Sequence, residues 1–587
     1  MKKIMCIIFS LLMILSVYNF AYAEVNENIS AEALDFDNVK AISDDLSGLG
    51  NSDLPAKYDS RDYGYITSVK RQPSGSCWAY SIIGAMEASD IKRGVASSDV
   101  DYSEGHLIWF TGNPKNERYF DKDAADGKNV GSEILNSGAN NLQALPVLTL
   151  CGLSNESDYP YNENTVNGFS ISYSEKYINT SNRVLSKMLN LTGINEIKQA
   201  IIDYAAVNAS MYFSSDYLTV MTRPNDKLWE NYYCSEKKET NHGVVIVGWD
   251  DNFSHEYFVK EPPIDGAWLV KDSNGTSPRW DGYYWVSYAD ANFGGATLFE
   301  SMANDFSKIY SYTTGYTSLK SLNANYVSNV YTAENDISIE KAGFIIKNGN
   351  TEYTVSLYTG LTDDSNPSSG KLIDKTSITV TSELDGVNYI TVSFNNENYV
   401  RSGEKYSIVV TANPLNANTT VSFPVEYVSD FYVEPGQSFV KSSANSKWYD
   451  VTNDLWFIYS YGNLCINAYT VTVDKIPDDY NPPVIPDNPD TPVTPDNPYE
   501  CSHNFVTERI EPTCETDGRE RVYCSKCGAE KYNVVLSHIG HEYGEEIQTG
   551  FNLFARDCKN CGHRNEYSKN LNFFEKIYYF FKFLFKF

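Results

Sequence analysis

The sequence has little positive charge for its length. Its 587 residues include 47 Lys and Arg against 76 Asp and Glu, which gives a formal net charge of −29 at pH 7. Proteins that bind nucleic acids need basic patches to neutralise phosphates, so this composition argues against a nucleic-acid partner. An acidic surface instead favours solubility outside the cell.

The apolar run at the N-terminus is too short for a comfortable membrane span. It extends from Ile4 to about Val17, after two lysines and before Ala21-Tyr22-Ala23. A basic start, a short apolar stretch and small residues are typical of a secretory signal peptide, which we assign to residues 1–23. An uncleaved anchor is the alternative, but a spanning helix needs about 20 apolar residues. No cysteine follows Ala23 directly, so we do not expect lipid anchoring.

A cysteine stands at the beginning of a helical pattern. Apolar residues recur after Cys77 with the i, i+3, i+4, i+7 spacing of an amphipathic helix, at Ala79, Ile82, Ile83 and Met86. A thiol at a helix N-terminus feels the positive end of the helix dipole, and a neighbouring protonated histidine lowers its pKa further. His242, far downstream, is the candidate partner, so the pair predicts a nucleophilic thiolate. The alternative is a buried structural cysteine and an unrelated histidine.

The segments around both residues resemble the papain-like cysteine peptidases over about residues 54–300. The motifs that carry the resemblance stand in the family's order, at 54–61 (LPAKYDSR), 75–78 (GSCW), 103–107 (SEGHL), 152–161, 241–249 (NHGVVIVGW) and 268–276 (WLVKDSNGT). The resemblance implies a two-lobed α+β peptidase domain over 54–300. It also implies a protein or peptide substrate and no cofactor for catalysis.

The resemblance also implies a role for particular residues. Cys77 is the nucleophile, His242 the acid and base, and Asp272 the residue that orients the histidine. Gln72 donates to the oxyanion, and Gly138 contacts the substrate backbone, where the absence of a Cβ lets a peptide approach. An ordinary loop turn is an equal alternative for Gly138.

Two positions depart from the family pattern. Asp272 stands where the family usually has Asn, and Asn274 stands where it has Trp. A carboxylate still accepts the imidazole N–H and stabilises the imidazolium more strongly than an amide, so we favour Asp272 over a shifted Asn274. Gln72 lies five residues before Cys77 instead of six, and Pro73 follows it. A solvated loop amide is the alternative for Gln72.

Two rival functions remain, and these departures are the best support for the first of them. The first rival is a non-catalytic cell-surface adhesin or glycan-binding protein, in which a degenerate papain-like fold serves as a scaffold. The second is another class of cysteine hydrolase, against which the 268–276 motif argues.

Residues 24–53 form a short pro-segment, which we interpret as a spacer and not as an inhibitory domain. Within the peptidase region, Cys151 and Cys234 are the other thiols. They either pair or stay reduced, and the sequence leaves both open.

Residues 305–472 predict an antiparallel β-sandwich. Apolar residues alternate with polar ones, as at Tyr353, Val355 and Leu357, and turn residues such as Asp385-Gly386 separate the segments. The segments 333–335, 342–344 and 352–358 resemble the lectin-like domain that follows papain-like peptidases in some secreted bacterial proteins. The resemblance implies binding of a cell-surface glycan; the alternative is a sandwich that only stabilises the peptidase.

The region after the sandwich has three parts. Residues 473–500 are a Pro-rich linker, for which we expect an extended polyproline-like chain. Residues 501–566 hold two Cys-x-x-Cys pairs, Cys524 with Cys527 and Cys558 with Cys561, each followed by Gly. Such pairs predict a zinc-ribbon-like module with a structural zinc ion, with disulfide pairing as the alternative.

Residues 567–587 form an aromatic amphipathic tail. Glu575, Tyr579, Lys582 and Lys586 lie on one stripe, and aromatic and aliphatic residues fill the other side. The tail predicts association with a membrane surface or cell wall. Taken together, the sequence predicts a secreted, extracellular cysteine endopeptidase that carries a lectin-like sandwich and associates with the cell surface.

Overall fold

The computed structural model describes two compact units, 1–487 and 488–587, each of which we treat by itself. The described residues are 31–33, 40–44, 46, 54–72, 75–112, 138–161, 181–222, 228–313, 319–416, 419–427, 433–453, 461–478, 480–482, 505–514, 518–524, 530–536, 543–545, 547–549 and 553–568. The predicted signal peptide, most of the Pro-rich linker and most of the aromatic tail lie outside them. Among the described helices, none is long and apolar enough to cross a membrane.

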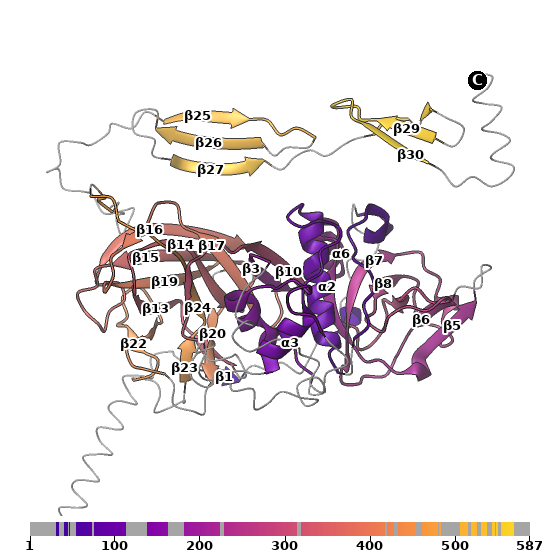
Figure 1. Ribbon diagram of the computed structural model, residues 1–587, viewed down its shortest axis with the longest axis horizontal. Coiled ribbons are helices and arrows are strands. Elements are labelled where there is room, and N and C mark those ends of the chain that lie inside the picture. Colours follow the sequence, from indigo (N-terminus) through magenta and orange to yellow (C-terminus); the bar gives the residue numbers. More distant parts are fainter. Residues whose placement is uncertain are drawn as a thin grey trace, which may run out of the picture. The chain divides into compact units, whose positions relative to one another are not determined.

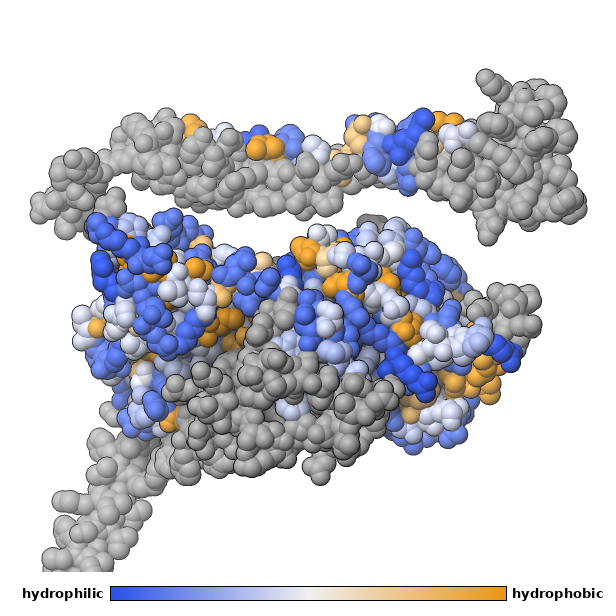
Figure 2. All heavy atoms as spheres, in the orientation of Figure 1, coloured by the Kyte–Doolittle hydropathy of each residue, from blue (hydrophilic) through white to orange (hydrophobic). Residues whose placement is uncertain are grey.

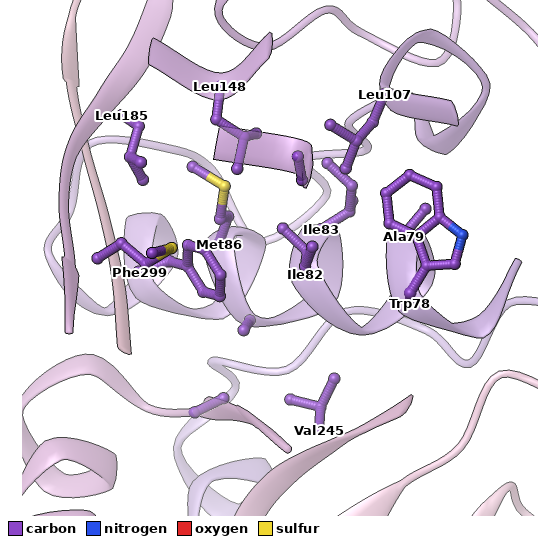
Figure 3. Packing of buried hydrophobic residues seen from close by; sticks show 14 of the residues in the cluster. Trp78, Ala79, Ile82, Ile83, Met86, Leu107, Leu148, Leu185, Val245 and Phe299 are labelled. Carbon is purple, nitrogen blue, oxygen red and sulfur yellow. The ribbon is translucent and has the colours of Figure 1, made fainter. Parts of the chain in front are cut away.

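Helix α2 (Cys77–Lys92) lies at the centre of the first lobe (Figure 1). The predicted helix is confirmed, but it is buried on nearly all sides and not along one stripe. Figure 3 shows why: Trp78 and Ile83 face Leu107 and Leu148 on one side of the helix, while Val245 packs on the other. Other helical elements of this lobe are α3 (Glu104–Gly112), α5 (Asn141–Pro146), a π-helical turn (Val147–Cys151) and α6 (Ile194–Tyr204).

The second lobe is built on an antiparallel sheet with one parallel pair. Its strands are β4 (Val207–Met211), β5 (Leu218–Thr222), β6 (Leu228–Tyr232), β7 (His242–Asp250), β8 (Ala267–Lys271) and β9 (Tyr283–Ser287). The parallel pair is β6 with β9. Large aromatic side chains fill the core of the second lobe, where Trp249 and Trp268 are fully buried. Strand β2 (Lys57–Asp59) pairs with β7 and brings the start of the domain to this sheet.

The sheet continues from the peptidase region into the sandwich. Strand β10 (Gly294–Ala303) pairs with β3 (Arg183–Asn190), and β3 pairs with β17 (Asn388–Ser393) of the sandwich. In the described part of the chain, this one sheet contains 14 strands. Its sandwich strands also include β11 (Lys308–Tyr310), β14 (Ile337–Ile346), β18 (Tyr399–Val400) and β24 (Ile466–Thr472).

Two further sheets complete the sandwich. The first has the order β16-β15-β19-β13-β21-β22, from β13 (Tyr326–Thr332), β15 (Thr351–Thr359), β16 (Lys371–Val380), β19 (Lys405–Pro414), β21 (Ser438–Lys441) and β22 (Tyr449–Asp450). The second has the order β1-β12-β20-β23, from β1 (Ala31–Ala33), β12 (Leu319–Asn323), β20 (Ser422–Tyr427) and β23 (Tyr461–Leu464). Alternating side chains of these strands meet in one apolar core.

The junction between the peptidase region and the sandwich is tightly hydrogen-bonded. The Asn190 N–H donates to Asn388 Oδ1 at 2.6 Å, and Asn190 Nδ2 donates to the Val387 carbonyl at 2.6 Å. Tyr389 of the sandwich packs within the same apolar cluster as α2. The two regions therefore share a core as well as a sheet.

The predicted pro-segment takes part in both regions. Ala31–Ala33 pairs with β12 at the edge of the sandwich. Ile42 is 4% exposed and packs into the core of the second lobe, and its N–H donates to the Phe293 carbonyl at 2.8 Å. The described part of this segment is thus built into the fold, where the sequence indicated only a spacer.

The C-terminal unit contains two small antiparallel sheets. One has β25 (Phe505–Ile510), β26 (Gly518–Cys524) and β27 (Glu530–Leu536), and the other has β28 (Ile547–Gln548), β29 (Leu553–Asp557) and β30 (Arg564–Ser568).

In the first unit, Cys151 and Cys234 are both buried free thiols. The α+β peptidase fold followed by a β-rich domain is confirmed.

Hydrophilic residues dominate the face of the first unit shown in Figure 2, with small hydrophobic groups between them. Two exposed apolar side chains belong to β5, where Val220 is 52% and Met221 38% exposed.

Candidate active site

The Cys77 thiol lies at the first residue of α2, between the two lobes. Burial opposes its ionisation, but a hydrogen bond from His242, the charge of that imidazole, and the N–H groups of Gly243 and Trp78 outweigh it. The pKa of Cys77 therefore lies below its ordinary value. A thiolate is the nucleophilic form of cysteine, so this environment favours covalent chemistry.

The glycine beside His242 lets the two lobes meet closely. A Cβ on Gly243 would lie 2.8 Å from Ser81 Oγ and 3.3 Å from the Cys77 carbonyl oxygen. Ser81 cannot easily give way, because its hydroxyl donates to the Trp78 carbonyl at 3.0 Å and accepts from Asn208 Nδ2 at 2.7 Å. Gly243 therefore brings β7, and with it His242, against the N-terminus of α2.

His242 begins β7 and links the thiol to a carboxylate. Its Nε2 lies 2.9 Å from Asp272 Oδ1, so the other ring nitrogen, Nδ1, is left for Cys77. Burial alone would lower the pKa of His242, but the hydrogen bonds and negative charges of Asp272 and Cys77 raise it to about 9. A lowered thiol pKa and a raised imidazole pKa together favour a thiolate–imidazolium pair near neutral pH.

Asp272 is held by its own loop, directly after β8. It is 4% exposed, and its Oδ1 accepts the Ser273 N–H at 2.7 Å while its Oδ2 accepts Asn274 Nδ2 at 2.8 Å. The structure therefore places Asp272 against the imidazole and Asn274 behind the carboxylate. Asn274 fixes the orientation of the carboxylate and does not replace it.

Gln72 is tied to this same loop. Its N–H donates to the Ser273 carbonyl at 2.6 Å, and its side-chain Oε1 accepts the Ser273 hydroxyl at 2.5 Å. Arg71 and Asn274 form an antiparallel bridge beside them. The Ser273 hydroxyl therefore fixes the orientation of the Gln72 side-chain amide relative to the Asp272 loop. Pro73 and residue 74 lie outside the described residues.

Phe213 is a site residue that the sequence analysis missed. Its ring centroid lies 5.7 Å from that of His242. Asn241 holds it there, since Asn241 Oδ1 accepts the Phe213 N–H at 2.7 Å and Asn241 Nδ2 donates to the Phe213 carbonyl at 3.1 Å. Such a ring covers part of the imidazole from water. The only local signal was an Asn directly before the catalytic histidine, which is too weak to identify a partner 28 residues upstream.

A buried ionic cluster lies behind the Asp272 loop. Lys70 Nζ contacts Glu87 Oε1 at 2.9 Å and Glu104 Oε1 at 2.8 Å. Lys271, which directly precedes Asp272, donates to Thr67 Oγ1 at 3.0 Å. Burial lowers the pKa of Lys271 to about 8. The cluster anchors the end of β8 from which the Asp272 loop begins.

The remaining predicted site residues are less constrained. Gly138 has φ +66°, a backbone conformation that glycine adopts more easily than other residues. A Cβ added to it would have no atom within 4 Å, so the backbone conformation by itself explains why a glycine stands there. Its contact with substrate stays a prediction. Cys527 and the side chain of Cys524 lie outside the described residues, so their metal role also stays a prediction. Cys558 and Cys561 are described within the C-terminal unit.

Comparison with known families gives two matches along the chain. Residues 54–302 match the papain family cysteine protease model, and residues 309–470 match the lectin like domain model.

Curated relatives match the first region. A probable cysteine protease RD19B of Arabidopsis thaliana is 30% identical over 241 residues, which is 40% of this chain and 59% of that protein. Cathepsin O of Homo sapiens is 27% identical over 236 residues, 40% of this chain and 61% of that protein. The chain thus spans less than two thirds of the length of these relatives.

Two solved structures share the arrangement of both regions. A substituted form of the clostridial cysteine protease Cwp84, after propeptide cleavage, has a TM-score of 0.58 at 24% identity and covers 71% of this chain and 99% of its own. The cysteine protease and lectin-like domains of Cwp84, a surface layer associated protein of Clostridium difficile, give a TM-score of 0.60 at 22% identity. The match covers 76% of this chain and 99% of that structure. At these identities the likeness concerns the fold.

Proposed function

Because residues 54–302 belong to the papain family of cysteine proteases and residues 309–470 are a lectin-like domain, we propose that this chain is a secreted cysteine endopeptidase. One observation carries the proposal: the Cys77 thiol at a helix N-terminus is hydrogen-bonded to an imidazole that Asp272 holds at 2.9 Å. This arrangement supports the roles of nucleophile, base and orienting carboxylate for Cys77, His242 and Asp272, despite the departures at Asp272 and Gln72.

In the first half of the reaction the enzyme is acylated. The Cys77 thiolate attacks the carbonyl carbon of a peptide bond, and the carbonyl electrons move to oxygen. The Cys77 backbone N–H and the Gln72 side-chain amide stabilise this oxyanion, an effect worth roughly 3–4 kcal/mol for a single donor. When the C–N bond breaks, the His242 imidazolium gives its proton to the leaving amine.

In the second half water releases the acyl group. His242, now neutral, takes a proton from water as the hydroxide oxygen attacks the thioester carbon. The C–S bond breaks, the carboxylic product leaves, and the thiolate–imidazolium pair is restored. Asp272 holds the ring in one orientation throughout, fixes the tautomer of its neutral form and stabilises its positive form.

A peptide-cleavage assay tests this function. The full chain should hydrolyse a fluorogenic peptide, and Cys77→Ala should abolish the activity, because it removes the proposed nucleophile. Cys234→Ala, which removes another buried thiol of the same domain, is the matched control and should keep most of it. Equal rates for wild type and Cys77→Ala would end the proposal. An epoxide inhibitor should label only Cys77, as peptide mapping by mass spectrometry would reveal.

We further propose that the chain acts outside the cell, on proteins that its lectin-like domain reaches through a surface glycan. The location is supported by the signal-peptide pattern of residues 1–23, and the glycan by the lectin-like match. The full Cys77→Ala chain applied to a carbohydrate array should bind a defined glycan class. Binding to none would contradict the glycan part and leave the peptidase proposal untouched.

A further inference from the structure

Three cysteine sulfurs converge in the C-terminal unit. The Sγ atoms of Cys514, Cys558 and Cys561 all lie within 4.8 Å of one another, and Cys514 Sγ is 3.7 Å from Cys558 Sγ. Cys514 and Cys558 are buried, and Cys561 is exposed. None of the three has a part in the proposed peptide cleavage.

We propose that these three thiolates bind one structural zinc ion, which joins the two small sheets of the C-terminal unit. Zinc–sulfur bonds of about 2.3 Å in a tetrahedron place two ligand sulfurs about 3.8 Å apart. The separation of 3.7 Å between Cys514 and Cys558 fits this value. A disulfide needs about 2.05 Å and would leave one of the three sulfurs without a partner.

Two of the ligands come from a turn that is fixed by its own backbone. Cys558 and Cys561 lie between β29 and β30, where the Cys558 N–H donates to the His563 carbonyl at 2.8 Å. The Gly562 N–H donates to the Cys558 carbonyl at 2.9 Å, and Gly562 has φ +74°, which a glycine adopts without strain. The turn therefore holds two thiols close together at little further cost in backbone entropy.

The third ligand comes from the other sheet. Cys514 lies between β25 and β26, beyond the end where Ile510 pairs with Arg519. The Cys524 backbone pairs with Phe505 at the opposite end of the same two strands. Cys524 is five residues along β26 from Arg519, which corresponds to about 17 Å. Cys514, and not Cys524, is therefore the cysteine of the first sheet that completes this site.

A metal ion would add to the stability of this unit. Among its described side chains, the buried apolar ones are Cys514, Ala555 and Cys558. A structural zinc ion contributes its binding free energy to folding, and this contribution matters where few apolar side chains are buried, as in the described part of this unit. Soft thiolates in a tetrahedral arrangement favour zinc among the common divalent ions, and water would supply the fourth ligand.

Zinc content of the full-length protein tests the site. The Cys77→Ala background prevents self-cleavage, and elemental analysis gives zinc per chain. Cys514→Ser should lose one equivalent of zinc, whereas Cys514→His, which keeps a zinc-binding side chain, should retain it. Cys465→Ala, which removes a buried thiol of the sandwich, is the matched control and should keep the wild-type content.

Cobalt substitution gives a second measurement that does not depend on yield. The Co²⁺-loaded protein should show the visible bands of tetrahedral thiolate coordination, and Cys514→His should shift them. Unchanged zinc in Cys514→Ser would overturn the proposal. So would a zinc-free protein, purified without reductant, in which peptide mapping finds Cys514 disulfide-bonded to Cys558 or Cys561.

Discussion

A carboxylate stands where the papain pattern has an amide, and this single residue changes the charge of the site. Asp272 lies 2.9 Å from His242 Nε2, and Asn274 holds its second oxygen. The negative charge stabilises the imidazolium, and this is one reason why the pKa of His242 is raised to about 9. The consequence is a site that keeps its ion pair at higher pH.

The pH profile of Asp272→Asn tests this consequence. Activity requires His242 protonated, so kcat/KM in the wild type should fall as pH rises through about 9. Without the carboxylate the pKa of His242 decreases, and the alkaline limb should move down by about 1 unit or more. Asp265→Asn, which removes the carboxylate beside the exposed His255, should leave the profile unchanged. An alkaline limb that stays in place in Asp272→Asn would contradict this role.

Ser273 positions the proposed oxyanion donor without touching the reacting atoms. Its hydroxyl donates to Gln72 Oε1 at 2.5 Å. Ser273→Ala keeps the backbone N–H that holds Asp272 but removes this bond, so we expect kcat to fall by roughly fivefold, or about 1 kcal/mol. The pH limbs should not move, because the triad is intact.

A double-mutant cycle separates positioning from a general loss of structure. In a Gln72→Ala background, Ser273→Ala should have no further effect on kcat, since the group that it positions is gone. Ser277→Ala, on the same loop but exposed, is the control and should behave as wild type. Additive losses would show that Ser273 acts through something other than Gln72.

At the scale of elements, the N-terminal segment joins regions that are distant in sequence. Ala31–Ala33 forms an edge strand of the sandwich, and Ile42 fills the core of the second lobe. Edge strands expose unpaired backbone groups, so β1 covers β12. The same segment therefore stabilises both the peptidase region and the sandwich.

We expect Ile42→Ala to destabilise the full chain by about 2–4 kcal/mol, because it removes a fully packed side chain and leaves a cavity. Urea unfolding in the Cys77→Ala background, which keeps the segment attached, measures the change. Lys237→Ala, which breaks only the exposed ion pair with Asp44, should cost less than about 1 kcal/mol. Similar unfolding midpoints for the two variants would mean that the segment does not stabilise the fold.

At the scale of the whole molecule, the peptidase region and the sandwich behave as one body. They share a sheet through β3 and β17, and a core that includes Tyr389. Relative motion of the two regions would break the hydrogen bonds from Asn190 to Asn388 and to the Val387 carbonyl. A domain that binds a surface would then hold the active site at a constant distance from it.

We therefore expect the two regions to unfold in one transition. Seven of the nine tryptophans lie within residues 54–302, so tryptophan fluorescence reports mainly the peptidase region. Asn388→Ala lies in the sandwich, yet it should lower the thermal midpoint seen by fluorescence, because it leaves the Asn190 N–H without its acceptor. Asn413→Ala, an exposed position in the same domain, is the control. Two calorimetric transitions within this body would contradict the prediction.

Local motifs were enough to predict three residues that the structure brings together. Cys77 at the start of α2, His242 at the start of β7 and Asp272 after β8 were all predicted from the sequence. A helix start, a strand start and a glycine beside a histidine are short-range patterns, so they can be read from the sequence. The β-rich domain was predictable because the alternation of apolar and polar residues is local, whereas the α+β class of the peptidase region followed from the family resemblance.

Tertiary structure alone decided which distant segments meet. It placed Phe213 on the His242 ring, Ser273 on Gln72, and Cys514 beside Cys558 and Cys561. Each of these contacts joins segments whose separation in the chain carries no periodic signal. Their partners depend on how buried surfaces pack against one another, so no single segment of the sequence determines them.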